Sequence, residues 1–281
     1  MKIGENGWTD DWRSLDDFYY AYQPPNFQAG DFYLRNHTID FIPSDTEYIW
    51  KSLLNDTKDR KFLKSHALDY NSIQYHNVEE FIEYYKLNPI TYQLNSLGFR
   101  DSDWDKKPKT VDLYLGCSFT FGIGLHLKDV WTSKLQAQLN HPFLNGGIPG
   151  SGIIPQYRLL MYLLKRFKIR NVFHLFPYTH PRYEYYDLEH YHSFNLNDAP
   201  NGHPLFTPEN VSTLNHAFLK GLERVCNENK INYIRLNKIP KWDVNMDTQP
   251  LTQIYGRDLL HVGPAFHDII KDEFFNKIVG S

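Results

Sequence analysis

Short apolar runs alternate with longer amphipathic stretches from Thr110 onward. The apolar runs have the length of strands, and the amphipathic stretches repeat their apolar residues at helical spacing. We expect strands over 111–116, 142–148, 171–177 and 231–236, and helices over 130–140, 153–167, 208–230 and 264–279. Strands that alternate with long helices are typical of βαβ units around a parallel sheet. Residues 110–281 are therefore predicted to form one α/β domain, a three-layer α/β/α sandwich with a parallel sheet.

Residues 1–109 follow a different pattern. Helical spacing occurs only in patches, over 45–56 and 77–87, and the prolines at 24–25 indicate a turn. The basic run "KKPK" at 106–109 comes directly before the first expected strand. We expect a mostly helical and irregular N-terminal extension that packs on the sandwich or on a partner, which would also suit assembly into a homo-oligomer.

Charge and hydropathy exclude some classes of partner. The 281 residues carry a net charge of −3, whereas proteins that bind nucleic acid usually present a basic field. No apolar run reaches the about 18 residues that a membrane-spanning helix needs, and the opening "MKIGENGWTDDW" lacks the apolar core of a secretion signal. We therefore expect no nucleic-acid partner, no membrane partner and a soluble protein, either cytoplasmic or associated with a phage or another assembly.

Cysteine and aromatic residues narrow the picture further. Cys117 and Cys226 can form one bridge at most, so a disulfide framework is excluded and a reducing compartment is favoured. Aromatic residues make up 16% of the chain, and many of the 20 tyrosines gather in tracts such as "RYEYYDLEHYH". Such tracts line sugar-binding grooves or subunit interfaces, or pack in the core.

The stretch "LYLGCSFTFGIG", from Leu113 to Gly124, places Ser118 directly after the first expected strand. Ligands of open α/β sheets bind at the carboxyl ends of strands, which makes this loop a candidate site. The loop lacks the spacing and the Lys of a P-loop, the dinucleotide fingerprint and the G-x-S-x-G elbow of α/β-hydrolases. Two interpretations of Ser118 remain open, a cap of the following helix or a nucleophile.

A nucleophilic serine needs a base, and the base needs an orienting group. Asp258 and His261 form a D-x-x-H pair in "GRDLLHVGP", on a loop that leads into the last expected helix. A second pair with this spacing, Asp187 and His190, lies in the tyrosine-rich tract without such a setting. We therefore select Asp258 and His261 as the partners of Ser118.

Three blocks, "YLGCSFTFG", "NGGIPGSG" and "GRDLLHVGP", occur in the order and with the rough separations of the blocks that define the SGNH, or GDSL-type, hydrolases. The resemblance covers residues 95–281, and "LNSLGFRDSDW" resembles the segment before the catalytic strand in a subset of that family. It implies an SGNH, flavodoxin-like fold. It also implies that Ser118 is the nucleophile, that His261 is its general base and that Asp258 orients the imidazole.

The second block concerns the oxyanion hole. The resemblance implies that the backbone N–H of Gly150 joins that of Ser118 in facing the developing oxyanion. Gly146 and Gly147, in the same block, are interpreted as residues needed for turn geometry.

The chain departs from the family pattern in two places. Cys117 stands where the first block usually has an Asp, a position outside the triad. The third block usually supplies an Asn as a further oxyanion donor, and "NVFHLFPYTHPRYEYY" has none after its apolar run. Thr179 lies at or near that position and is expected to donate in its place. Tyr178, His180 and Arg182 are alternative donors or substrate contacts.

Histidines gather in the same part of the chain. A zinc site could be imagined from His174, His180, His190, His192 and His203, but no ligand spacing such as H-E-x-x-H is present. We expect no metal and no cofactor.

The combined expectation is a serine esterase that hydrolyses O-acetyl or other short acyl esters, with an acylated carbohydrate as substrate, through an acyl-enzyme. One alternative is an O-acyltransferase with the same triad. Another is a binding or structural protein that keeps the fold without turnover, docked by its N-terminal extension into a virion or surface assembly.

Overall fold

The structure is a computed structural model of the chain. It describes residues 38–39, 78–149, 151–176, 182–186, 191–195, 208–236, 249–257 and 261–280.

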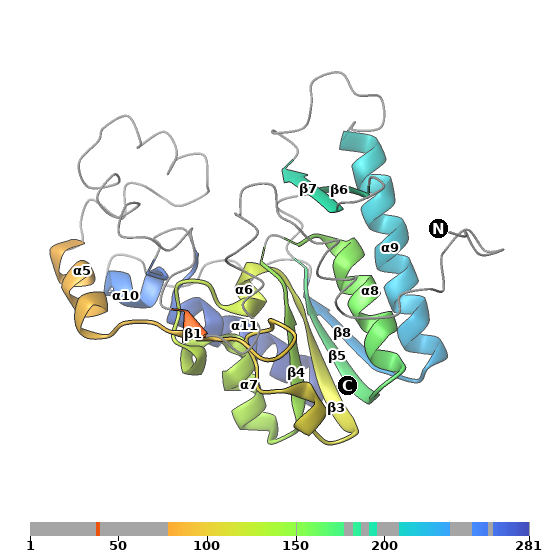
Figure 1. Cartoon of the computed structure of the whole chain (residues 1–281), viewed down its shortest axis with the longest axis horizontal. Coiled ribbons are helices and arrows are strands. Elements are labelled where there is room, and N and C mark those ends of the chain that lie inside the picture. The colour runs from red at the N-terminus through yellow and green to blue at the C-terminus, as the bar shows by residue number, and fades with distance from the viewer. Residues whose placement is uncertain are drawn as a thin grey trace.

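In this described part of the chain, a four-stranded parallel sheet forms the centre of the molecule (Figure 1). Its strands are β3 (Thr110–Gly116), β4 (Phe143–Gly147), β5 (Lys168–Leu175) and β8 (Asn232–Leu236), in the spatial order β4-β3-β5-β8. All four expected strands are confirmed. β5 begins at Lys168, earlier than the expected 171, because the apolar run is preceded by the alternating residues Lys168, Ile169 and Arg170. The order shows that the chain reverses its direction of winding at β3.

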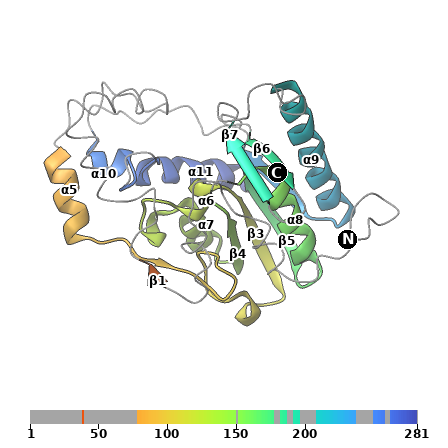
Figure 2. The ribbon, with the colours of Figure 1, turned by 45° about the horizontal axis from the view of Figure 1, so that its top comes forward.

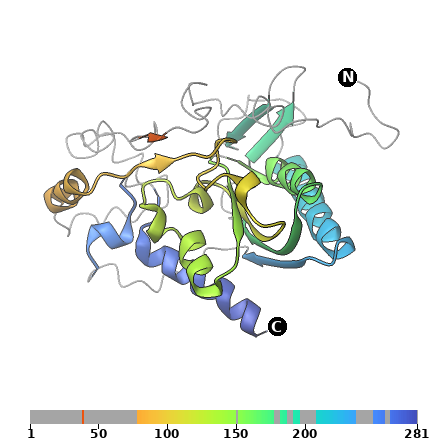
Figure 3. The same cartoon turned by 60° about the horizontal axis from the view of Figure 1, so that its bottom comes forward.

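Helices cover both faces of this sheet (Figures 2 and 3). α7 (Trp131–Leu139) and α11 (Pro264–Val279) pack together on one face, and α8 (Ile153–Leu164) and α9 (Pro208–Glu228) pack together on the other. The predicted three-layer α/β/α sandwich is therefore confirmed, with each expected helix present.

Strand β3 shows why both faces are covered. Leu113 and Leu115 belong to the core under α8 and α9, whereas Tyr114 belongs to the core under α7 and α11. Because successive side chains of a strand point to opposite faces, the apolar run from Leu113 to Leu115 must be buried on both faces.

The N-terminal extension is described in part. α5 (Val78–Leu87) confirms one of the two expected helical patches, and the other, 45–56, lies outside the described residues. β2 (Tyr92–Gln93) pairs antiparallel with β1 (Thr38–Ile39), and the short helix η2 (Trp104–Lys106) precedes β3.

The extension and the sandwich share a hydrophobic core. Phe81 and Tyr92 from the extension lie in one buried cluster with Phe121, Ile254 and Phe266 from the C-terminal part. The rings of Tyr92 and Phe121 stack with their centroids 6.0 Å apart. Residues 78–109 are therefore built into the sandwich rather than tethered to it.

The hydrophobic pattern does not predict one element, an antiparallel hairpin of β6 (Arg182–Tyr186) and β7 (Tyr191–Asn195). Its sequence is rich in aromatic residues, which favour strands, but it interrupts the β-α rhythm of the domain. Asp187 and His190 lie between the two strands, outside the described residues. Among the described helices, none combines the length and apolar character that crossing a membrane requires.

Candidate active site

Three neighbouring strands end level with one another at one edge of the sheet. Gly116, the last residue of β3, pairs with Gly147 at the end of β4 and with Leu175 at the end of β5. Ser118 follows two residues after Gly116 and begins the one-turn helix α6 (Ser118–Phe121). The central strand at which winding reverses is where open α/β sheets bind ligands, so Ser118 occupies the expected position for chemistry.

The turn into α6 depends on a tight backbone at Gly116. A Cβ on Gly116 would lie 2.0 Å from the side-chain oxygen of Thr120 and 2.9 Å from the carbonyl oxygen of Leu175. The carbonyl of Cys117 then accepts hydrogen bonds from the N–H groups of Thr120 and Phe121, both at 3.0 Å. The chain therefore turns away from β3 after Gly116, and α6 begins at Ser118.

The capping interpretation of Ser118 is wrong. Cys117, not Ser118, occupies the N-cap position of α6, and no side chain caps this helix. Ser118 is half-buried, and its Oγ lies 3.9 Å from the Sγ of Cys117. Its hydroxyl is therefore not used to hold the helix end.

The second block approaches α6 closely. A Cβ on Gly147 would lie 2.4 Å from the backbone nitrogen of Phe121, and one on Gly146 would lie 2.8 Å from Cδ2 of Leu159. Both glycines lie within β4, so their interpretation as turn residues is wrong. They are needed because α6 and α8 pack directly against the strand. Gly150 lies outside the described residues.

Asn145 joins β4 to α6. Its Nδ2 donates to the carbonyl of Thr120 at 3.3 Å, and its Oδ1 accepts from the N–H of Gly147 at 3.0 Å. Its own N–H donates to the carboxylate of Asp101 at 2.9 Å, which satisfies a donor on the outer edge of β4. The sequence shows Asn145 only as one polar residue in a glycine-rich run, so nothing there indicates this bridging role.

The structure brings His261 to α6, although 143 positions separate it from Ser118 in the sequence. The imidazole of His261 meets the ring of Phe119, the residue after Ser118, edge to face at a centroid distance of 5.5 Å. Two backbone hydrogen bonds close its loop: Gly256 N–H donates to the His261 carbonyl at 2.8 Å, and Arg257 N–H donates to the Gly124 carbonyl at 2.8 Å.

The remaining predicted site residues stay predictions. Arg182 begins β6, and nothing is described of its side chain. The others, Asp258, Tyr178, Thr179 and His180, lie outside the described residues.

A buried polar chain lies behind the second block. His174 at the end of β5 is fully buried, and burial lowers the pKa of His174 to about 3. Its Nε2 donates to Oε1 of Gln156 at 2.7 Å, and its Nδ1 accepts from the hydroxyl of Tyr233 at 2.6 Å. Gln156 in turn donates to Oγ of Ser151 at 3.2 Å, next to Gly150. Both ring nitrogens of His174 are thus occupied, which removes it from any zinc site.

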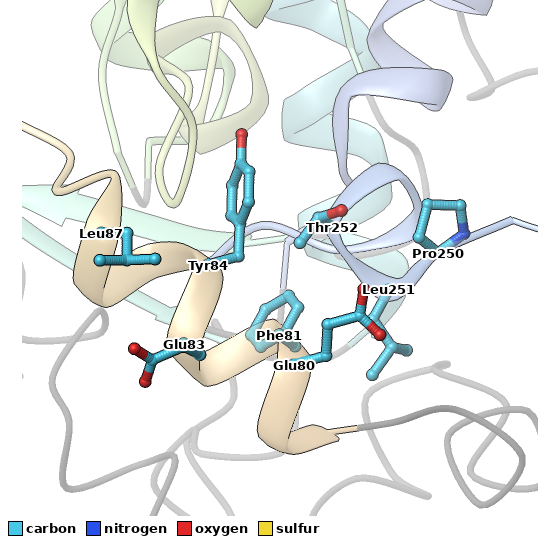
Figure 4. A pocket seen from close by; sticks show the side chains of 8 residues that line it. All are labelled: Glu80, Phe81, Glu83, Tyr84, Leu87, Pro250, Leu251 and Thr252. Carbon is cyan, nitrogen blue, oxygen red and sulfur yellow. The ribbon is translucent and has the colours of Figure 1, made fainter.

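The described ranges hold no group of three or more His, Cys, Asp or Glu side chains that could bind a metal ion. A hollow of about 310 Å³ lies between α5 and α10 (Leu251–Ile254), and neither Ser118 nor His261 lines it (Figure 4).

No family model matches the chain, and no curated protein matches it. Two solved structures align with part of the chain. One is a psychrotrophic esterase, EstA, from a Pseudoalteromonas species, described as inhibited by monoethylphosphonate. It is 15% identical and covers 62% of this chain and 98% of its own, with a TM-score of 0.38. The other is a member of the lipolytic G-D-S-L family from Veillonella parvula, 11% identical, covering 60% of this chain and 98% of its own, with a TM-score of 0.36. What the chain does is therefore inferred from its own residues.

Proposed function

We propose that this chain is a serine esterase with Ser118 as nucleophile. The observation that carries the proposal is the approach of His261 to α6: an imidazole from the C-terminal loop lies against the residue next to a serine at the carboxyl end of the central strand. A serine hydroxyl becomes an effective nucleophile when a positioned imidazole takes its proton.

The reaction then follows two steps. Oγ of Ser118 attacks the carbonyl carbon of the ester while His261 accepts the hydroxyl proton. The carbon–oxygen bond to the alcohol breaks, and His261 returns the proton to the leaving alcohol. Water then attacks the acyl carbon while His261 accepts a proton from it. The bond between the acyl carbon and Oγ of Ser118 breaks, the acid leaves, and His261 returns the proton to Oγ. Asp258 is assigned the role of orienting His261 and stabilising the imidazolium.

The oxyanion hole is proposed from the strand ends. Because β3, β4 and β5 end level, the residues that follow them emerge at one edge of the sheet. We assign the N–H groups of Ser118 and Gly150 as donors, with the Thr179 hydroxyl as a third. A single such donor contributes about 3 kcal/mol to stabilising a transition state. Tyr178, His180 and Arg182 are assigned to substrate contacts at the same edge.

The substrate class rests on the sequence. The resemblance of the three blocks and the abundance of tyrosine support a short acyl ester, such as an acetyl group, on a carbohydrate. Acetate released from acetylated xylan or a similar polysaccharide, measured with and without an added acceptor sugar, distinguishes hydrolysis from acyl transfer.

The proposal is tested with p-nitrophenyl acetate and a fluorophosphonate probe. Wild-type protein should hydrolyse the ester and bind one equivalent of probe, and Ser118→Ala should abolish both. Ser212→Ala, on an exposed position of α9, is the matched control and should change neither. Hydrolysis that survives in Ser118→Ala would overturn the assignment of the nucleophile.

The choice between the two D-x-x-H pairs is tested in the same assay. Asp258→Asn should lower kcat by about 100-fold or more, because the imidazole loses its orienting carboxylate. Asp187→Asn should leave kcat unchanged. The reverse result would show that the wrong pair was selected.

A further inference from the structure

A buried arginine from the N-terminal extension binds the C-terminal end of α6, the helix that begins at Ser118. Arg100 has only 1% of its surface exposed. Its Nη1 donates to the carbonyls of Gly122 and Phe121, the latter at 3.3 Å, and its Nη2 donates to the carbonyl of Leu125 at 2.7 Å. A single guanidinium thus binds three carbonyls of the segment that follows Ser118.

Tyr92 contacts the same segment, and we call Arg100 and Tyr92 together the Arg100 clamp. The guanidinium of Arg100 lies over the ring of Tyr92, 4.4 Å from its centroid. The Tyr92 hydroxyl accepts a hydrogen bond from the N–H of Gly124 at 2.9 Å. Two side chains from before β3 therefore contact the backbone of Phe121, Gly122, Gly124 and Leu125.

Helix α6 needs such support because it is a single turn. Helices this short are unstable alone, since forming the first turn fixes several residues for one hydrogen bond. The last carbonyls of a helix also lack partners within it, and a cation near them is favourable. β3 fixes the Ser118 end of α6, and Gly122 ends the helix in the left-handed conformation at φ 82°. Arg100 meets the turn at that opposite end.

Asn145 links the clamp to the second block. Its Nδ2 also approaches the carbonyl of Arg100 at 3.4 Å, besides that of Thr120. A shift of Arg100 would consequently displace α6, which begins at the proposed oxyanion donor Ser118, and would weaken its contact with β4.

We propose that Arg100 is a positioning residue that sets the orientation of Ser118 for catalysis. The inference rests on the proposed serine esterase function and adds to it a role for the extension. Arg100 acts through the backbone of 121–125 and not on the substrate. The planar fork of a guanidinium reaches three carbonyls while it stacks on an aromatic ring, whereas a lysine ammonium cannot do both.

The test compares Arg100→Lys and Arg100→Met with a matched arginine at the other end of the sheet. Arg170 binds the buried carboxylate of Asp112 through Nε and Nη2, both at 3.0 Å, where β3 and β5 begin. Arg170→Met should lower the melting temperature and leave kcat within about two-fold of wild type when assayed well below melting. It measures what a loss of stability alone does to activity.

Arg100→Met should lower kcat and the rate of fluorophosphonate inactivation by about 30-fold or more, with KM within about three-fold of wild type. Arg100→Lys should lie between Arg100→Met and wild type. Should Arg100→Met fail to fold, Tyr92→Phe is the second probe, because it keeps the ring and removes only the acceptor for Gly124; it should lower kcat by about three-fold or more.

Three results overturn the inference. One is an Arg100→Met kcat within two-fold of wild type, and another is an equal kcat loss in Arg170→Met at the same folded fraction. The third applies where Arg100→Met does not fold: wild-type kcat in both Arg100→Lys and Tyr92→Phe. A wild-type protein that neither hydrolyses the ester nor reacts with the probe overturns the proposed function as well. If wild type is active and Ser118→Ala abolishes that activity, the Arg100 variants test the positioning role alone.

Discussion

Burial keeps two histidines of this protein, His267 and His174, in their neutral form. His267 on α11 is buried, and its Nδ1 accepts the N–H of Trp131, the first residue of α7, at 3.0 Å. Burial lowers the pKa of His267 to about 3, and the nearby positive charges of Lys134 and Arg100 act in the same direction. A protonated His267 would lose this acceptor and place a charge between α7 and α11. His174 is held neutral by burial in the same way.

These two histidines predict acid lability. In the unfolded chain each has a pKa near 6.5, and in the folded protein a pKa of about 3, so the unfolded state binds more protons between these values. Their contribution to stability is complete above pH 6.5 and is lost progressively as the pH falls toward 3. Urea unfolding at pH 7.5, 6 and 5 should show a falling free energy of unfolding.

His267→Asn provides the matching variant, because its Oδ1 can accept from Trp131 without titrating. It should reduce the slope of stability against pH below 6.5. His216→Gln, on an exposed position of α9, should keep the wild-type slope. Equal slopes in wild type and His267→Asn would show that another group dominates the acid response.

At the scale of elements, strand β4 and helix α6 are packed so closely that no side chain fits between them. Gly147→Ala would place its Cβ 2.4 Å from the nitrogen of Phe121 and 2.6 Å from the carbonyl carbon of Thr120. These are backbone atoms, so α6 itself must move. We expect a loss of about 1 to 3 kcal/mol of unfolding free energy, together with a loss of esterase activity.

Gly221→Ala on α9 is the control for that substitution. The atoms nearest to the new Cβ there belong to the ring of Tyr157, at 3.3 Å, and alanine favours a helix over glycine by about 1 kcal/mol. The tight contact and the helix preference act in opposite directions, so stability and activity should remain close to wild type. A Gly147→Ala protein with wild-type kcat would show that the packing of β4 on α6 does not position the site.

Elements that bury regular faces were predictable, and contacts between distant segments were not. The helix 264–279 follows from the helical spacing of its apolar residues, and the strand 111–116 follows from its short apolar run. Ser118 at a strand end followed from the same pattern. The contacts of Arg100 with the segment after Ser118 could not be predicted, because those three carbonyls lie 21 to 25 residues further on and a lone arginine in a sequence is expected to be exposed. The hairpin over 182–195 was missed because its alternating aromatic residues interrupt the β-α order.

At the scale of the whole molecule, the sequence pattern changes at residue 109, but residues before and after this position pack into the same hydrophobic clusters. Phe99 stacks on Trp104 at 4.2 Å, and both lie in the core under α8 and α9. Lys107 donates to the carbonyl of Phe143 at 2.8 Å, and its ammonium pairs with Asp101 at 2.7 Å. The segment before β3 thus covers the outer edge of β4, which protects an edge strand from pairing with another chain.

This packing predicts that residues 78–109 and the sandwich unfold as one unit. A chain that begins at Thr110 would expose Phe121, Ile254 and Phe266, and it would lack the Arg100 clamp and the cover of β4. It should be aggregation-prone and lack a cooperative thermal transition. A chain that begins at Val78 keeps those contacts and should melt in one transition. If instead the chain from Thr110 is monomeric, melts cooperatively and hydrolyses ester at the wild-type rate, the boundary at 109 separates independent domains, and neither the shared core nor the clamp supports the site.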